Sequence, residues 1–243
     1  MVSIITVSYN SEKTIEKTIE SVLNQSYDDI EYIIIDGDSF DHTVDIIKSY
    51  EDKFIKRGYD YKWISENDDG IASAWNKGLK IANGDIISLL NSDDWYEEHA
   101  VRKAVDCLNV NKAEISYGIC KKISDGQVYN TIDRKLKKWK IYLNLNFSHT
   151  TCFKTRKTYD CVGLFDDNYD IALDIDFLLR AYNKKVNFKK CNNITFMKKG
   201  GISEKYEVEA RKEYLQALIE NGFNPFLSYL GYLIKFILSF KRS

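Results

Sequence analysis

The sequence predicts an α/β fold built on a mostly parallel central sheet flanked by helices, and three observations support this. In the first half of the chain, short β-branched apolar runs alternate with segments of helical periodicity. Polar clusters follow several of these runs, as they do at the carboxyl ends of parallel strands. In the second half the strand-like runs are shorter and less regular, which indicates a mixed subregion followed by C-terminal helices.

Each predicted strand of the first half is followed by a predicted helix. Ser11 is the candidate N-cap of the first helix, whose apolar positions include Ile15 and Ile19 on one face. Gly84 is expected to end the third helix by adopting a left-handed conformation. The strands are predicted at residues 2–7, 30–35, 61–64 and 85–90, and the helices at residues 11–23, near 44–47, at 70–83 and at 99–108.

The second half reads as short strands, a hairpin and two helices. Asp125-Gly126 is a strong hairpin signal between two of the strands. We expect one domain over residues 1–205, with halves at 1–110 and 111–205, and a helical tail over 206–243. The strands are predicted at residues 114–117, 119–123, 128–132, 186–189 and 194–197, and the helices at 173–183 and about 203–221.

Composition excludes several classes of protein. Lys+Arg 35 against Asp+Glu 36 gives a net charge of −1 over 243 residues, which argues against a general nucleic-acid binder. The five cysteines form no C-x-x-C pair, so neither a disulfide framework nor a zinc site is expected, and a reducing compartment is favoured. The amino terminus lacks the basic start of a signal peptide, which favours a cytoplasmic protein.

Three polar clusters follow predicted strands, at residues 8–10, 36–39 and 91–94. Any one of them is explained by residues that end a strand and cap the next helix. Three clusters at one rim of a parallel sheet instead favour a ligand site. Neither a G-x-G-x-x-G motif nor a Walker A loop is present to indicate another mode of nucleotide binding.

Asp93 and Asp94 are the most informative pair in these clusters. Adjacent carboxylates repel each other unless a cation or a helix start absorbs their charge. Mg²⁺ or Mn²⁺ often takes one or two carboxylates together with substrate phosphates. A doubled helix-start signal explains the pair equally well, and both readings stay open at this point.

Four segments, read in order, resemble the motifs of a known family. They are VSIITVSYN, IIIDGDSFDHT, SENDDGIASAWNKGLKIANGDIISLLNSDDWYEE and, later, LDIDFLLR. Their succession resembles the family-2 glycosyltransferases with the GT-A (Rossmann-like) fold, above all the bacterial branch that builds surface polysaccharides. The resemblance extends from Met1 to about Ser203. In many relatives a second acid follows the first after the second strand, whereas Gly37 stands there in this chain.

The resemblance implies roles for individual residues. Asp93 would contact ribose or sugar, and Asp94 would bind the Mn²⁺ or Mg²⁺ that bridges the diphosphate. Lys77 would meet phosphate or sugar, although a solvated surface charge explains it equally well. The full set implied for the donor is Thr6, Ser8, Tyr9, Asn10, Asp36, Asn76, Lys77 and Asp93.

The later segment implies the catalytic base. Asp176 and Arg180 form an i,i+4 pair, which gives Asp176 a structural task. The match to the family's E-D-x-D-x-x-x-R stretch places the base on Asp174, for which helix capping is the alternative. His149 would be an acceptor-side or phosphate contact, with ordinary packing as the alternative.

Together these residues imply an inverting, metal-dependent glycosyltransferase. A nucleoside-diphosphate sugar would donate to a hydroxyl of a glycan or lipid-linked glycan in surface polysaccharide synthesis, and no nucleic acid would take part. The alternative is a sugar-nucleotide-binding or nucleotidyltransferase-like protein that transfers no sugar.

The run over residues 225–240 is apolar almost all round and ends in Lys241-Arg242. It is shorter than the ~20 residues that a spanning helix needs. We expect it to lie at a membrane surface, at the inner face of the cytoplasmic membrane, with packing on the domain or on a second copy as the alternative.

Overall fold

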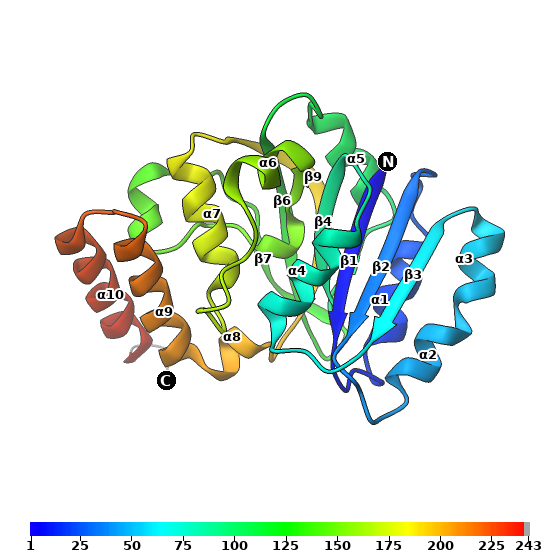
Figure 1. The fold of residues 1–243 in the computed structure, drawn as a ribbon. Helices are drawn as coiled ribbons and strands as arrows, with labels where there is room; N and C mark the ends of the chain where they lie inside the picture. Colours follow the sequence, from blue (N-terminus) through cyan, green and yellow to red (C-terminus); the bar gives the residue numbers. More distant parts are fainter. Residues whose placement is uncertain (241–243) are drawn as a thin grey trace.

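A computed structural model describes residues 1–240, and in this part of the chain nine strands form one sheet. The strand order is β3-β2-β1-β4-β8-β6-β9-β5, and β7 pairs with β6 (Figure 1). The four strands predicted for the first half pair in parallel, as expected: β1 Val2–Ser8, β2 Ile30–Asp36, β3 Asp60–Ser65 and β4 Ile86–Asn91.

The second half of the sheet is mixed, which confirms the change of character expected there. A short strand, β8 (Phe153–Thr155), runs antiparallel to both β4 and β6 and so joins the two halves. The Asp125-Gly126 turn closes the hairpin, with φ of 51° and 76° at its two residues. The other strands are β5 Trp95–Tyr96, β6 Glu114–Ser124, β7 Gln127–Ile132 and β9 Asn187–Lys198.

Two pairs of predicted strands are in fact single long strands, β6 and β9, that pair in parallel. Their register shifts at Gly118, where an added Cβ would lie 2.1 Å from the carbonyl oxygen of Asn193. The local irregularity interrupts the period-2 pattern, so the sequence shows two runs where the structure has one strand.

Helices cover both faces of the sheet. Figure 1 shows α4, α6 and α7 on one face, where they pack with α9 into one apolar core, while α1, α2, α3 and α5 enclose a second core on the other face. The helices are α1 Ile15–Leu23, α2 Thr43–Ser49, α3 Glu51–Arg57, α4 Ile71–Ile81, α5 Ala100–Cys107, α6 Arg156–Val162, α7 Leu173–Asn183, α8 Ile202–Lys205, α9 Glu207–Glu220 and α10 Pro225–Phe240, with 3-10 turns η1 Lys138–Tyr142 and η2 His149–Thr151.

Two local predictions about helix ends are wrong. The N-cap position of α1 is Thr14, and the hydroxyl of Ser11 instead contacts the backbone of Tyr9. Helix α4 ends with Ala82 in an extended conformation, and Gly84 does not have a positive φ. Glycine is needed at position 84 because a Cβ would lie 2.5 Å from the backbone nitrogen of Ser3.

A disulfide bond joins Cys107, at the end of α5, to Cys191 in β9, and it corrects the expectation of unpaired cysteines. The two residues are 84 positions apart in sequence, so no short spacing marks the pair. Helix α5 packs against β9 and brings them within 6.4 Å between Cα atoms. The other cysteines are free: Cys120, Cys152 and Cys161.

Candidate functional site

The carboxyl ends of β1, β2 and β3 form a rim that is organised by one buried carboxylate, that of Asp36 (the lower edge of the sheet in Figure 1). Its two oxygens accept four hydrogen bonds from Ser8 (2.9 Å), the Ser39 backbone (2.9 Å) and hydroxyl (2.6 Å), and Ser65 (2.8 Å). A carboxylate with this many donors holds the loops that end three strands. The geometry therefore favours a supporting role for Asp36 over the direct nucleotide contact expected from the sequence.

Thr6 lies inside the fold and not at the rim. Its side chain is fully buried, and its hydroxyl accepts a hydrogen bond from Tyr32 at 3.1 Å. The motif includes Thr6 because β1 is part of the motif, but successive side chains of a strand point to opposite faces. The donor contact expected for Thr6 is thus not supported by its position.

Tyr9 and Phe40 present two exposed aromatic rings at this rim. The rings meet edge to face with centroids 6.2 Å apart, and their side chains are 61% and 83% exposed. Asn10 links the two loops, because its backbone nitrogen donates to Ser39 and its side-chain oxygen accepts from the backbone of Phe40. Phe40 is not among the residues that the sequence predicts for the site, because its ring contact is with Tyr9 in another loop.

Asn76 and Lys77 occupy α4 beside the rim. The Asn76 amide exchanges two hydrogen bonds with the backbone of Phe165, both 2.9 Å, so this residue holds α4 to the loop before α7. Lys77 forms an ion pair with Glu66 at 2.6 Å and is 25% exposed, so it is not a free surface charge. Glu66 follows β3 directly, so the pair lies beside the rim.

Asp94 is held at the end of β4 with its carboxylate 1% exposed. Its two oxygens accept hydrogen bonds from the Asn91 side chain and the Lys198 backbone, both at 3.2 Å. Thr18 donates to the backbone oxygen of Asp94 at 2.7 Å. These contacts place the carboxylate between the end of β4 and the end of β9.

Both adjacent acids have raised pKa values. Burial raises the pKa of Asp94 well above its usual range, and the neighbouring charge of Asp93 adds to the effect. Burial also raises the pKa of Asp93, whereas the charges of Lys198 and His149 act in the opposite direction. A buried and a half-buried carboxylate that share one turn form a site that a cation would stabilise.

The donor set at this turn fits a hard divalent ion that is completed by a ligand. Within residues 1–240, no three acidic, histidine or cysteine side chains are grouped as metal ligands. Mg²⁺ and Mn²⁺ need only one or two carboxylates when phosphate oxygens and water fill the remaining positions. Asp93 and Asp94 therefore fit a metal that binds together with a diphosphate, and do not fit a metal held by protein alone.

Asp174 lies in the first turn of α7, where its Oδ2 atom is 3.1 Å from Nδ1 of His149. The helix is capped by other groups, because Glu213 of α9 accepts from the backbone of Ile171 and Ala172 at 2.8 Å each. Helix α7 has no side-chain cap hydrogen bond at its N-cap. The capping alternative for Asp174 is therefore not supported, and Glu213 is a residue that the sequence analysis did not single out.

Asp176, the other acid in the first turn of α7, has the structural role predicted for it. Asp176 accepts a hydrogen bond from Arg180 at 2.8 Å and a second from Asn221 at 2.9 Å. It is buried and fully engaged. This leaves Asp174, with a side chain 18% exposed, as the acid of α7 that remains accessible.

His149 connects the rim acids with Asp174. Its Nδ1 contacts Asp174, and the ring is near enough to Asp93 for a protonated imidazole to lower the pKa of that carboxyl. The ring packs against Trp75 of α4 at 5.5 Å between centroids. A buried amine, Lys154 of β8, also acts on Asp174, and burial lowers the pKa of that amine. Asp174 of α7 and Asp93 of the turn after β4 thus both lie near His149.

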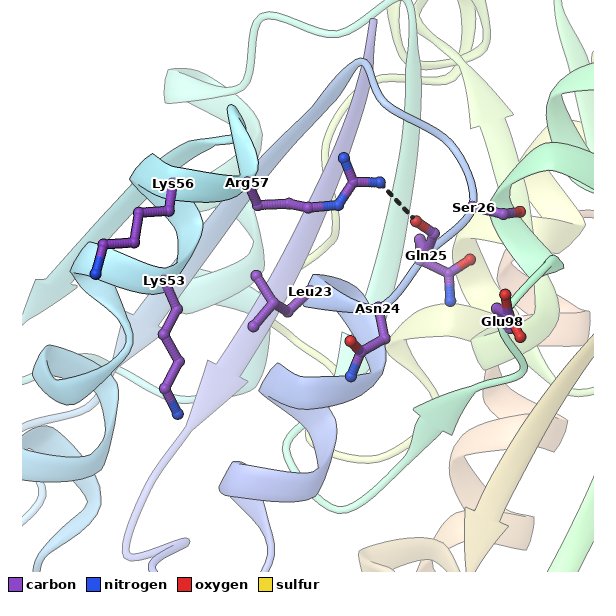
Figure 2. Close-up of a pocket in the computed structure, with 8 residues that line it drawn as sticks. All are labelled: Leu23, Asn24, Gln25, Ser26, Lys53, Lys56, Arg57 and Glu98. Carbon is purple, nitrogen blue, oxygen red and sulfur yellow. Dashed lines mark hydrogen bonds between the residues drawn. The ribbon is translucent and has the colours of Figure 1, made fainter.

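A pocket in the described part of the chain lies away from these acids. Figure 2 shows a pocket of about 530 Å³ at the amino ends of β2 and β3, where Arg57 donates to the backbone of Gln25 at 3.2 Å. None of its residues belongs to the site expected from the sequence. In an open α/β sheet, ligands bind at the carboxyl ends of strands, so the rim acids and not this pocket mark the candidate site.

The chain is similar to known proteins in both sequence and fold. A sequence model of the family described as "Glycosyl transferase family 2" matches residues 3–168. The chain is 38% identical over 120 residues to the Escherichia coli protein named "UDP-Glc:alpha-D-GlcNAc-diphosphoundecaprenol beta-1,3-glucosyltransferase WfaP". That match covers 48% of this chain and 45% of the relative, so the chain spans less than half the length of WfaP.

Two solved structures have the same fold at low sequence identity. Staphylococcus aureus TarS 1-349 in complex with UDP-GlcNAc is 19% identical, with a TM-score of 0.64 over 93% of this chain and 69% of that chain. The mannosyltransferase PcManGT from Pyrobaculum calidifontis, in complex with GDP-Man and Mn2+, is 15% identical, with a TM-score of 0.68 over 90% of this chain and 63% of that chain. Both likenesses concern the fold alone.

Proposed function

Since the chain belongs to glycosyl transferase family 2 and has the GT-A fold, we propose that it transfers a sugar from a nucleoside-diphosphate sugar to an acceptor hydroxyl with inversion. The observation that carries the proposal is that His149, whose Nδ1 contacts the accessible carboxylate of Asp174 at 3.1 Å, is also a neighbour of Asp93 in the acidic turn. Inverting transfer needs a base on the opposite side of the sugar from the leaving diphosphate. Asp174 of α7 and the Asp93-Asp94 turn after β4 are proposed to occupy these two positions.

Asp174 is the proposed base. It accepts the proton of the acceptor hydroxyl as that oxygen attacks the anomeric carbon and the bond to the diphosphate breaks. General base catalysis of this kind contributes about 10²- to 10⁴-fold. The partial exposure of Asp174 supports the role, because a base must reach the proton that it removes.

Asp94, with Asp93 beside it, is the proposed holder of Mn²⁺ or Mg²⁺. When bound, this ion would neutralise charge that grows on the departing diphosphate. The protein itself contributes a turn that Asn91 and the Lys198 backbone fix in place. Pre-arranged carboxylates of this kind need little reorganisation when the donor binds.

The exposed rings of Tyr9 and Phe40 are proposed to bind the nucleotide base. Aromatic faces stack on bases irrespective of base identity, at about 1–3 kcal/mol each. We propose a uridine diphosphate sugar as donor, because WfaP is named for UDP-Glc and TarS was solved with UDP-GlcNAc. Asp36 then supports the site indirectly, because its hydrogen bonds to Ser39 hold the loop that carries Phe40.

The acceptor is proposed to be a lipid-linked glycan of surface polysaccharide synthesis. WfaP is named for a diphosphoundecaprenol-linked sugar, and such a substrate lies in a membrane. Among the described residues, no helix is long and apolar enough to cross a bilayer. We propose that the chain meets this acceptor at the inner face of the cytoplasmic membrane.

Helix α10 is the proposed membrane contact, because its polar side faces the protein and its apolar side faces outward. Ser228 and Gly231 are buried, and the Lys235 amine lies 4.5 Å from the Tyr214 ring, where burial lowers its pKa to about 8. Figure 1 places α9 and α10 at the edge of the molecule farthest from α2 and α3. The exposed apolar side chains are Phe226, Leu227, Tyr229, Leu230, Leu233, Ile234, Phe236, Ile237 and Leu238.

A helix with its apolar side facing outward suits a bilayer interface. Its apolar side chains can enter the boundary of the acyl chains while basic residues meet anionic headgroups. The basic pair Lys241-Arg242 lies outside the described residues. Cosedimentation with vesicles that contain anionic lipid is the test. We expect binding by the wild type, loss in the double variant Leu230→Ser/Ile237→Ser, and no change in the exposed control Ile55→Ser.

A donor screen followed by a transfer assay tests the proposed activity. We expect UDP-sugars, with Mn²⁺ present, to raise the melting temperature of the protein and chelator to abolish the effect. With a GlcNAc-diphospholipid acceptor, the product should carry an inverted anomeric bond. Donor binding without transfer to any acceptor would favour the binding-only alternative, and transfer that survives chelation would refute the role of Asp94.

A further inference from the structure

His149 makes a set of contacts that an ordinary packed histidine would not need. Its Nδ1 lies 3.1 Å from the Asp174 carboxylate, with both side chains about one-fifth exposed. Its Nε2 is buried and has no hydrogen-bond partner within residues 1–240. A buried polar atom without a hydrogen-bond partner costs about 1–3 kcal/mol. The hydrogen bonding of Nε2 therefore does not explain why the ring has this orientation.

The backbone that carries His149 is rigid. It begins the 3-10 turn η2, which is closed by hydrogen bonds from the Cys152 nitrogen to His149 (2.8 Å) and from the Thr151 nitrogen to Ser148 (3.1 Å). Thr150 and Thr151 are completely buried beneath it. A side chain on such a turn can hold a partner in one place.

The imidazole ring is fixed in turn by Trp75. The two rings pack at 5.5 Å with an angle of 57° between their planes. Trp75 lies in α4, and Asp174 lies in α7, so the ring stands between the helices of the two halves of the sheet. No other side chain among the described residues forms a hydrogen bond or ion pair with the Asp174 carboxylate.

We propose that His149 is a positioning residue whose Nδ1 holds the Asp174 carboxylate toward the acceptor. This inference rests on the proposed function, in which Asp174 is the base. The Nδ1 contact engages Oδ2 and leaves Oδ1 to accept the proton of the acceptor hydroxyl. Contacts of this kind are often imperfectly aligned before substrates bind and tighten in the reactive complex.

Three substitutions separate this role from the alternatives. The side-chain nitrogen of asparagine lies near the position of Nδ1, that of glutamine near the position of Nε2, and phenylalanine keeps only the ring against Trp75. We expect His149→Phe and His149→Gln to lower kcat about 10- to 100-fold with the donor KM within twofold. His149→Asn should restore kcat to within about fivefold of the wild type.

The opposite ranking decides against the proposal. Wild-type kcat in His149→Phe, or a higher kcat in His149→Gln than in His149→Asn, would overturn it. A raised donor KM with unchanged kcat would instead identify a donor contact and would likewise overturn it.

A second measurement needs neither activity nor a variant. Nitrogen-15 NMR of the wild-type imidazole should show a proton on Nδ1, the atom that faces Asp174. A proton on Nε2 alone would overturn the proposal even if the enzyme transfers sugar. Absence of transfer by the wild type with all donors and acceptors would refute the proposed function, while the tautomer would still report whether the pair exists.

Discussion

Replacement of Asp94 by asparagine is expected to stabilise the metal-free protein while it removes metal-dependent donor binding. The carboxylate is 1% exposed and stands next to Asp93 in the same turn. Burial and the neighbouring charge both raise its pKa. A site built to receive a cation is thus a source of instability when the cation is absent.

The size of the effect follows from the contacts. Burial of an ion costs several kcal/mol, and the two 3.2 Å hydrogen bonds to Asp94 return about 1.5 kcal/mol each. Asparagine has the same shape, and rotation of the Asn91 amide lets the two side chains remain hydrogen-bonded. We expect Asp94→Asn to raise the free energy of unfolding at pH 7 by about 1–3 kcal/mol.

The raised pKa of Asp94 also determines how the stability difference between Asp94→Asn and the wild type changes with pH. The folded-state pKa of Asp94 lies above the unfolded value, so the folded protein binds more protons between the two values. The stability that this group contributes is therefore fully present below the unfolded pKa and is lost as pH rises through the folded pKa. The variant lacks this loss, and its advantage over the wild type should grow as pH rises.

Urea unfolding in EDTA, from pH 5 to pH 8, is the measurement. The exposed residue Asp52 provides the matched control, because Asp52→Asn removes one negative charge that is not buried. Mn²⁺ with UDP should stabilise the wild type and leave Asp94→Asn unchanged. The reasoning is refuted if Asp94→Asn is less stable than the wild type in EDTA, or if both proteins show the same pH dependence.

Three further changes test the fold that supports the site. Asp36→Asn should lower the free energy of unfolding by about 2–4 kcal/mol, because four hydrogen bonds converge on that carboxylate. Gly84→Ala should cost about 1–3 kcal/mol by overpacking, whereas Gly201→Ala, with open space around it, should cost less than about 1 kcal/mol. Reduction of the Cys107–Cys191 bond, which closes a loop of 84 residues, should cost about 2–5 kcal/mol. Urea unfolding measures all three.

Each of these has an outcome that contradicts it. An Asp36→Asn protein as stable as the wild type would show that the four donors do not depend on the charge. Equal costs for the two glycine variants would disprove the close approach at position 84. Cys161→Ser, which changes an exposed free thiol, serves as the control for the disulfide, and unchanged stability after reduction would contradict the pairing.

The regular elements were largely predictable from local patterns. Parallel strands in the first half follow from continuous β-branched runs, and β2 is buried along its whole length. The helix predicted at residues 173–183 is α7, Leu173–Asn183. Asp125-Gly126 forms the turn that its dipeptide indicates. In each case neighbouring residues carry the information.

Features that depend on distant contacts were not predictable. The short strand β8 has three residues and too little pattern to be seen, although it joins the two halves of the sheet. The Cys107–Cys191 pairing, and the close approach of Gly84 to Ser3, arise only when remote segments meet.

The same limit applies to the site. A motif places Asp36 and Asn76 near the donor, yet each side chain is occupied by hydrogen bonds within the protein. Sequence position could not reveal this, because orientation is set by the packing of whole elements. Glu213 and Phe40 were missed for the same reason, since both act through residues far from them in the sequence.

The most direct test of the account compares Asp174→Asn with the wild type in two assays on the same preparation. Calorimetry would measure the affinity for the donor with Mn²⁺, and single-turnover transfer would measure the chemical step. We expect the donor affinity to stay within about twofold and the transfer rate to fall at least about 100-fold. A transfer rate equal to that of the wild type, with the donor bound, would contradict the assignment of Asp174 as the base.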